Sequence, residues 1–318
     1  MKIDIITTPN EKLKETGFGG LKACQSIFEA IDIQDVTVSI NSCTKESDLD
    51  LIIKKNPDLV ILAVKYLELE DGEKIWLSEY FENQGVNFSG SSRKVLDFDS
   101  NKINAKDHLM KQGINTADYF TAIPDQFNCN NNPPIQFPLF LKPMDAANGN
   151  GVDDASFVEN LLDFETKVKS LYEDYNLPIL VEQYLDGREF TVAIIKSVEG
   201  EMIVSPIEIV PPESLNGIRI LGGKVKKEDS EELKFIEDSV VKNKLKDFAI
   251  NIFNKLGVKD FGRIDIKSIK NGSLFFLEAN LVPGMTKGSS YFPRAFEIEH
   301  KFSYNKVVNM MFGRVLKG

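Results

Sequence analysis

An arginine, two carboxylates and an amide interrupt the otherwise apolar stretch FGRIDIKSIKNGSLFFLEAN. They are Arg263, Asp265, Glu278 and Asn280, and an Asn-Gly pair at 271–272 separates the first two from the last two. Asn-Gly between two strand-like runs predicts a β-hairpin with a two-residue type I′ loop. In that register Asp265 faces Glu278 and Arg263 faces Asn280, because cross-strand pairs count outward from the loop. All four side chains then share one face of the hairpin.

The opposite face should be apolar, with Ile264, Ile266, Leu277 and Ala279 on it. The polar face poses a problem, because two carboxylates about 4 Å apart repel by ~4 kcal/mol at an effective dielectric near 20. A divalent cation would offset that repulsion, and Mg²⁺ usually takes one or two carboxylates plus substrate phosphates. The alternative is an exposed hairpin with solvated charges, against which the flanking LFFL and ANLV runs argue. A one-residue bulge would also break this register.

A strand-end lysine and a glycine-rich loop suggest phosphate binding. Lys142 ends the apolar strand PLFLKP, and the loop MDAANGNGVD, with Asn148 and Gly149, follows it. Glycines let backbone N–H groups converge on an anion, and the lysine supplies a point charge. The pattern is neither a Walker motif nor GxGxxG, and an exposed loop with a surface lysine is the alternative. A second lysine, Lys102 in DSNKINAK, would by itself indicate a solvated helix face.

Two glutamates flank the strand–turn–strand segment LVEQYLDGREFTV. Glu182 closes the first strand, and Glu189 follows the turn at Gly187. Backbone groups at a strand end can meet an adenine edge, and a nearby carboxylate can accept hydrogen bonds from ribose hydroxyls. An ordinary hairpin with surface acids is the alternative.

The elements that must position these residues alternate along the chain. Residues 1–90 combine the strands KIDIIT, VTVSI and DLVILAVK with helices, which predicts a small α/β unit with a parallel sheet. We expect a helix capped by Asp99 and closed by Gly113, another helix over 157–175, and a third over 231–256.

The composition is that of an ordinary globular protein, with 318 residues, 27% charged and 42% hydrophobic. The net charge of −10 argues against a general nucleic-acid or anionic-membrane surface. No run of eighteen apolar residues is present, and MKIDIITTPN lacks the apolar region of a signal peptide. Three scattered cysteines fit a reducing cytoplasm, and only two histidines are present, which excludes a histidine-rich zinc site.

The order of these motifs resembles the ATP-grasp superfamily, and within it the D-alanine–D-alanine ligases. The passages that carry the resemblance are FSGSSRKVLDFDSNKINAK, FPLFLKP, LVEQYLDGREFTV and GRIDIKSIKNGSLFFLEANLVPGMTKGSS. The resemblance covers most of residues 86–318 and, more loosely, the N-terminal unit. It implies a chain of mixed α/β and α+β class, an ATP-grasp fold with a preceding small parallel α/β domain. The implied parts are an N-terminal α/β domain (1–95), a central ATP-grasp subdomain (96–185) and a C-terminal ATP-grasp subdomain with the metal site (186–318).

The resemblance also implies roles for particular residues. For the nucleotide, it implies phosphate contacts from Lys102 and Lys142, a loop over the γ-phosphate with Asn148 and Gly149, an adenine site framed by Glu182 and Leu185, and a ribose contact from Glu189. For the reaction, it implies two Mg²⁺ ions (Mn²⁺ could replace them) on Asp265, Glu278 and Asn280, an oxyanion site made by Arg263 and the Gly284 amide, and a substrate carboxylate on Ser289.

Two regions depart from the D-alanine ligase pattern. The family holds the first substrate's amine with an early glutamate–serine turn, where this chain reads ETGFGGLKACQSI and offers Glu15 or a backbone nest at its glycines. The family's tyrosine-bearing loop is replaced by PPESLNGIRILGGKVKKEDSEE. Lys224 could stand in for that loop's lysine, but no tyrosine is present. The phosphate loop NGNGVD also lacks the usual serine pair.

Three interpretations of function remain. The first is a D-alanine–D-alanine ligase, in which a carboxylate attacks the γ-phosphate of ATP and an amine then attacks the acyl phosphate, with release of ADP and phosphate. The second is an ATP-grasp ligase for other amino acids or small peptides, in which Lys224 and Lys226 favour an acidic or longer acceptor. The third is a nucleotide-binding pseudoenzyme, which would have no need of Arg263. The expected partners are small amino-acid or peptide substrates, with no nucleic acid and no membrane, and the resemblance implies a homodimer.

Overall fold

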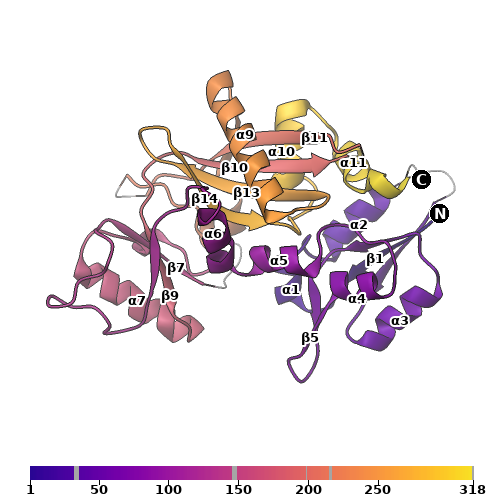
Figure 1. Cartoon of the computed structure of the whole chain (residues 1–318), viewed down its shortest axis with the longest axis horizontal. Coiled ribbons are helices and arrows are strands. Elements are labelled where there is room, and N and C mark those ends of the chain that lie inside the picture. Colours follow the sequence, from indigo (N-terminus) through magenta and orange to yellow (C-terminus); the bar gives the residue numbers. More distant parts are fainter. Residues whose placement is uncertain (32–35, 145–148, 198, 215–216, 317–318) are drawn as a thin grey trace.

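Three β-sheets of three to five strands form the framework of the computed structural model (Figure 1). The structure describes residues 1–31, 36–144, 149–197, 199–214 and 217–316. Within these ranges, no helix combines the length and the apolar character that crossing a bilayer requires.

The N-terminal sheet is parallel, with the strand order β2-β1-β3, which confirms the parallel α/β unit predicted for this region. Its strands are β1 (Lys2–Thr7), β2 (Thr37–Ser42) and β3 (Leu59–Leu62). The accompanying helices are α1 (Glu11–Glu15), α2 (Leu21–Ala30), α3 (Glu46–Lys54) and α4 (Leu77–Asn83). The sequence patterns do not indicate the short hairpin of β4 (Tyr66–Glu68) and β5 (Lys74–Trp76) that precedes α4.

The central sheet has the strand order β6-β9-β7-β8, and its paired strands are antiparallel. Its elements are β6 (Tyr119–Ala122), β7 (Leu139–Pro143), the 3₁₀ turn η1 (Asp154–Ser156), β8 (Phe157–Val158), α7 (Leu161–Tyr175) and β9 (Ile179–Gln183). The helix predicted from residue 157 begins later, because the Asn160 side chain accepts a hydrogen bond from the Asp163 N–H (3.0 Å) and caps it.

The C-terminal sheet is antiparallel, with the strand order β12-β11-β10-β13-β14. Its strands are β10 (Glu189–Lys196), β11 (Met202–Val210), β12 (Glu232–Phe235), β13 (Phe261–Ser268) and β14 (Leu274–Asn280). Its helices are α8 (Gly223–Glu228), α9 (Ser239–Leu256), α10 (Tyr291–His300) and α11 (Tyr304–Leu316). The helix predicted over 231–256 is wrong at its start, because β12 occupies 232–235 and Asp238 caps α9 through hydrogen bonds from the N–H groups of Val240 and Val241.

Two helices, α5 (Arg93–Ser100) and α6 (Lys102–Met110), replace the single helix predicted after Asp99. Asp99 is not a cap, because it lies inside α5, and Asn101 caps α6 by accepting from the Asn104 N–H (3.0 Å). Asp99 instead pairs with Lys65 and accepts hydrogen bonds from backbone N–H groups just after β14. The second helix ends at Met110 with Lys111 as its C-cap, and Gly113, predicted to close it, lies in the turn that follows, with φ +77°.

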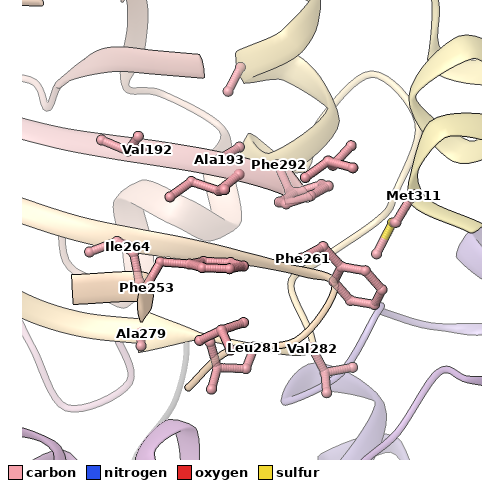
Figure 2. Close-up of a cluster of buried hydrophobic side chains, with 14 of the residues drawn as sticks. Val192, Ala193, Phe253, Phe261, Ile264, Ala279, Leu281, Val282, Phe292 and Met311 are labelled. Carbon is pink, nitrogen blue, oxygen red and sulfur yellow. The ribbon is translucent and has the colours of Figure 1, made fainter. Parts of the chain in front are cut away.

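The main hydrophobic core lies against the C-terminal sheet (Figure 2). Ile264 of β13 and Ala279 of β14 point into it, together with Phe253 from α9. Phe292 from α10 and Met311 from α11 extend the same cluster. The hairpin that carries the charged residues is therefore anchored on its apolar side by tightly packed residues, which fixes the position of its polar side.

Candidate active site

The register of the β13–β14 hairpin is the one predicted at its functional end. Asp265 pairs with Glu278 and Arg263 pairs with Asn280. The turn itself differs from the prediction, because Ile269 donates a hydrogen bond to Ser273 and accepts one from Gly272, which leaves a three-residue loop. A β-bulge between Asp265 and Ile266 then shifts the register by one residue and restores the predicted pairs.

The bulge changes which side chain reaches the core. Ile266 pairs with Phe276 rather than with Leu277, and Phe276 is fully buried. Leu277 is only partly buried and lines the pocket beside Glu278, so its predicted place on the apolar face is wrong. Ile264, Ile266 and Ala279 do lie in the core as predicted.

Asp265 is held by three neighbours. It accepts hydrogen bonds from Thr191 Oγ1 (2.6 Å), from Arg263 Nε (3.0 Å) and terminal nitrogen (2.9 Å), and from Asn280 Nδ2 (3.1 Å). Burial opposes the charge of Arg263, yet Asp265 raises the pKa of that guanidinium. This network fixes the orientation of Arg263 and Asn280 relative to Asp265.

Glu278 faces a group of cations. Lys102 Nζ lies 3.7 Å from Glu278 Oε2. Burial alone would raise the pKa of Glu278, but Lys102, Lys226, Lys142 and Arg263 together hold it well below its usual range. The repulsion expected between the two opposed carboxylates is therefore already offset by cations of the chain itself.

Two lysines and a glutamate form a buried triad. Glu182 Oε1 is 2.6 Å from Lys106 Nζ, and Glu182 Oε2 is 2.6 Å from Lys142 Nζ. Burial would raise the pKa of Glu182, but the two lysines lower it to about 2. Lys106 is missing from the residues singled out by sequence, although its spacing of four from Lys102 on α6 places both lysines on one helix face.

The structure contains two adjoining pockets, and the first of them is lined by nearly all of the residues expected at the nucleotide. Lys102, Lys142, Gly149, Glu182, Leu185 and Glu189 line it, together with Asp265, Glu278 and the apolar residues Phe140, Ile220 and Leu221. Glu189 Oε2 also pairs with Lys267 Nζ (3.1 Å). Asn148, expected in the same loop, lies outside the described residues.

The glycine-rich loop packs against a pair of glycines at the start of α8. Gly149 has φ +75°, and a Cβ added there would lie 3.0 Å from the backbone of both Gly222 and Gly223. A Cβ on Gly222 would lie 2.3 Å from the Val152 carbonyl oxygen. The two segments, far apart in sequence, thus touch backbone to backbone over the first pocket, which only glycine allows.

A second pocket adjoins the first and shares Lys102, Asn150, Lys226 and Glu278 with it. Arg263, Asn280, Gly284 and Ser289 line it, as do Thr16, Gly17, Lys65, Tyr66, Trp76, Glu231 and Tyr291. Of the residues expected to bind metal, Asp265 lines the first pocket, Asn280 the second and Glu278 both. The residues expected for the oxyanion and the substrate carboxylate line the second pocket. The N-terminal unit closes the second pocket through Gly17, Lys65 and the β4–β5 hairpin.

Two expected residues are placed differently. Lys224 is exposed and lines neither pocket, whereas Lys226, two residues further along α8, lines both. Glu15 is the last residue of α1, and its side chain lies outside the described part of the structure. Gly17 is required by packing, because a Cβ there would lie 2.2 Å from the Ala63 carbonyl oxygen.

The residues expected to bind metal supply a limited donor set. Asp265, Glu278 and Asn280 offer two carboxylates and an amide, and the described residues contain no group of three or more His, Cys, Asp or Glu side chains suited to a metal ion. Such a set fits Mg²⁺ only where phosphate oxygens complete the coordination, which is the way Mg²⁺ is usually bound with nucleotides.

Comparison with known proteins identifies the family of this chain. Residues 109–312 match the family model described as D-ala D-ala ligase C-terminus. A D-alanine–D-alanine ligase of Aquifex aeolicus is 29% identical over 273 residues, which cover 84% of this chain and 87% of that protein.

Two solved structures are similar over nearly their whole length. A D-alanine–D-alanine ligase from Bacillus anthracis complexed with ATP has a TM-score of 0.75 at 20% identity, and the match covers 100% of this chain and 98% of that one. A D-Ala:D-Ser ligase from Enterococcus faecalis has a TM-score of 0.72 at 19% identity, with 99% of each chain covered. These likenesses support the ATP-grasp fold. Because the family model spans well over half of its length, the chain belongs to the family of the D-ala D-ala ligase C-terminus.

Proposed function

We propose that this protein is an ATP-dependent carboxylate–amine ligase that joins two amino acids through an acyl phosphate and releases ADP and phosphate. The observation that carries the proposal is the junction of two pockets at Lys102, Lys226 and Glu278. One pocket has the apolar walls and paired lysines that a nucleotide needs, and the other holds an arginine aligned by a carboxylate. A phosphoryl transfer followed by an attack on a carbonyl requires these two environments side by side.

ATP is the nucleotide of the proposal. The name of the Bacillus anthracis structure includes ATP, and this chain has the same fold. Lys102 and Lys142 enter the first pocket and would neutralise phosphate charge, while Glu182, Leu185 and Glu189 would contact the adenosine. The glycine-rich loop at Gly149 would cover the terminal phosphate.

Asp265, Glu278 and Asn280 would bind two Mg²⁺ ions together with the phosphates of ATP, as the resemblance to the family implies. Mn²⁺ could replace Mg²⁺. When bound, the metal would neutralise the charge of the transferring phosphoryl group. The structural basis is their shared face at the pocket junction. Asp265 already pairs with Arg263, and Glu278 already pairs with Lys102. The β13–β14 hairpin therefore does not need a metal ion to keep its two carboxylates together.

The chain's own residues then account for the second step. Arg263 is positioned by two hydrogen bonds to Asp265 and, with the backbone amide of Gly284, would stabilise the oxyanion that forms when the amine attacks. Ser289 is exposed at the rim of the second pocket, where its hydroxyl could meet a substrate carboxylate. Lys226 would take the place proposed for Lys224, because it lines both pockets.

A second candidate is a ligase for an acceptor other than D-alanine. The segment PPESLNGIRILGGKVKKEDSEE (residues 211–232), which contains α8 and is called the lid here, lacks tyrosine. Its Lys226 and Lys227 line the second pocket. The similar protein named a D-Ala:D-Ser ligase is an example of a different acceptor on this fold.

We also propose that the chain divides into the parts 1–95, 96–185 and 186–318. We propose in addition that the protein forms a homodimer, which light scattering at defined protein concentrations would test.

The deciding experiment measures ADP release with ATP, Mg²⁺ and pairs of amino acids, D-alanine with D-alanine first. Hydroxylamine in place of the acceptor should trap the acyl phosphate as a hydroxamate. AMP and pyrophosphate as products would contradict the proposal and indicate adenylation. Nucleotide binding without ADP release for any pair would favour a nucleotide-binding pseudoenzyme.

A further inference from the structure

A half-buried glutamate at the end of the lid segment has one oxygen engaged and one without a partner. Glu231 lies between α8 and β12 and lines the second pocket. One carboxylate oxygen, Oε1, accepts a hydrogen bond from the Tyr291 hydroxyl. The other, Oε2, is buried and has no hydrogen-bond partner among the described residues. A buried carboxylate oxygen without a partner is unfavourable, so the arrangement suggests a ligand that completes it.

Tyr291 fixes which oxygen remains available. It is the first residue of α10 and is 9% exposed. Burial, followed by the neighbouring Glu231 carboxylate, raises the pKa of its hydroxyl well above the usual range, so it stays a hydrogen-bond donor. The Arg263 guanidinium lies 5.4 Å from the centre of its ring. Tyr291 therefore connects the proposed oxyanion residue on one side to Glu231 on the other.

The cations that line the pocket do not pair with this oxygen. Lys65, Lys226 and Lys227 line the same pocket, yet in the described part of the chain no lysine or arginine forms an ion pair with Glu231. Lys65 is paired with Asp99, and Arg263 with Asp265. Glu231 Oε2 could therefore accept a hydrogen bond from a positively charged group in the second pocket without competition from a cation of the chain.

We propose that Glu231 Oε2 binds the amino group of the acceptor substrate and that Tyr291 is the positioning residue that orients Glu231. The inference rests on the proposed ligase function and identifies the acceptor as an amine recognised by a carboxylate. The acceptor enters as an ammonium ion and pairs with Glu231 in the pocket that Arg263 and Gly284 also line. It then releases one proton to solvent, so that the nitrogen lone pair can attack the acyl carbon and expel phosphate. The lid therefore contributes a substrate contact as well as a cover, and α10 supplies the tyrosine that the lid sequence lacks.

The test uses the full-length Glu231→Gln variant with Mg²⁺ and ATP. Glutamine keeps the size of the side chain and the carbonyl oxygen that accepts from Tyr291, but removes the charge. We expect the acceptor KM to rise at least tenfold, while the KM values for ATP and for the first amino acid stay within twofold. Hydroxamate formation should also stay within twofold, because hydroxylamine at high concentration needs no ammonium site. Glu228→Gln, at the exposed end of α8, is the matched control and should match the unaltered protein.

Tyr291→Phe separates positioning from binding. It should raise the acceptor KM less than Glu231→Gln does, with unchanged KM for ATP. If hydroxamate and dipeptide formation fall in parallel in Glu231→Gln, the Glu231–Tyr291 contact only holds the lid in place and the inference is wrong. An unchanged acceptor KM in Glu231→Gln would also overturn it. If the unaltered protein traps no hydroxamate with any amino acid, the proposed function itself fails, which is a separate outcome.

Discussion

Asp265 and Glu278 face each other across β13 and β14, yet each carboxylate is neutralised by a different cation. Arg263 forms two hydrogen bonds to Asp265, and Lys102 lies 3.7 Å from Glu278. Burial by itself would raise the pKa of Glu278, but the cations around it lower that pKa below the usual range. The attraction to the cations therefore exceeds the repulsion between the two carboxylates.

The first prediction follows for Glu278→Gln. Without metal, this variant should unfold at a lower temperature than the unaltered protein, because Lys102 and its neighbouring cations lose their anion. The free energy of unfolding should fall by on the order of 1 kcal/mol, since the side chain is 29% exposed. With ATP and Mg²⁺, ADP release should be abolished. Calorimetry and a coupled ADP assay measure the two effects, with the exposed Glu159→Gln as control. Full activity of Glu278→Gln would remove this residue from the metal site.

The second prediction concerns acid stability through Glu182. Its pKa is lowered from 4.5 to about 2 in the folded protein, so its carboxylate stabilises the fold above pH 4.5. That contribution, about 3 kcal/mol, should be lost as the pH falls from 4.5 toward 2. Urea unfolding at pH 5.5 and pH 3 should show a smaller pH effect for Glu182→Gln than for the unaltered protein.

The same variant should also be less stable at neutral pH, by about 3–5 kcal/mol, because Lys106 is fully buried and would lose its anion. Glu159→Gln again serves as the control, since its side chain is exposed. An equal pH dependence in Glu182→Gln and in the unaltered protein would mean that another carboxylate accounts for the acid sensitivity.

The hairpin illustrates how far local sequence patterns reach. The apolar runs and the Asn-Gly pair are sufficient to predict two strands and the opposition of Asp265 and Glu278. The predicted two-residue loop is wrong, because Gly272 has φ +83° while Asn271 does not take a positive φ, and a type I′ loop requires both. The bulge at Leu277 compensates for the longer loop. A bulge depends on packing against the core and the pocket, which the local sequence does not encode.

Contacts between distant segments account for what the sequence does not reveal. The Lys106–Glu182 pair joins α6 to β9, and the Glu231–Tyr291 contact joins the lid to α10. Each depends on which sheets and helices come together, whereas helix and strand patterns report only on neighbours along the chain. Lys106 could have been found through its spacing from Lys102. For Glu231, no comparable local signal exists.

The third prediction concerns the acceptor. The lid has no tyrosine, and Lys226 and Lys227 line the second pocket, so we expect D-alanine to be a poorer acceptor than an acidic or longer amino acid. Misplacing reactants by about 1 Å can cost on the order of a hundredfold in rate, and this is the size of preference we expect. Steady-state comparison of D- and L-amino acids as acceptors measures it. A clear preference for D-alanine in both positions, with kcat/KM of about 10⁴ M⁻¹s⁻¹ or more, would contradict the prediction.

The last prediction concerns the contact between the glycine-rich loop and the lid. In Gly222→Ala the added Cβ would lie 2.3 Å from the Val152 carbonyl oxygen, so the two backbones must separate. Gly222 has φ −87°, which alanine adopts easily, and the effect should therefore come from the lost close approach and not from backbone strain. Because Gly149 and Gly223 meet at the same place, the first pocket should open to water where the phosphates of a bound nucleotide would lie.

We expect the KM for ATP to rise about tenfold or more and ADP release to slow, with little change in melting temperature. Limited proteolysis in the presence of a non-hydrolysable ATP analogue should cut the segment 211–230 faster in Gly222→Ala than in the unaltered protein. Gly313→Ala on α11 is the matched control, because a Cβ there meets no atom within 4 Å and alanine favours the helix. If Gly222→Ala keeps the KM for ATP and the cleavage rate of the unaltered protein, the two glycine segments do not close over the nucleotide, because a closed lid could not tolerate the extra carbon without moving.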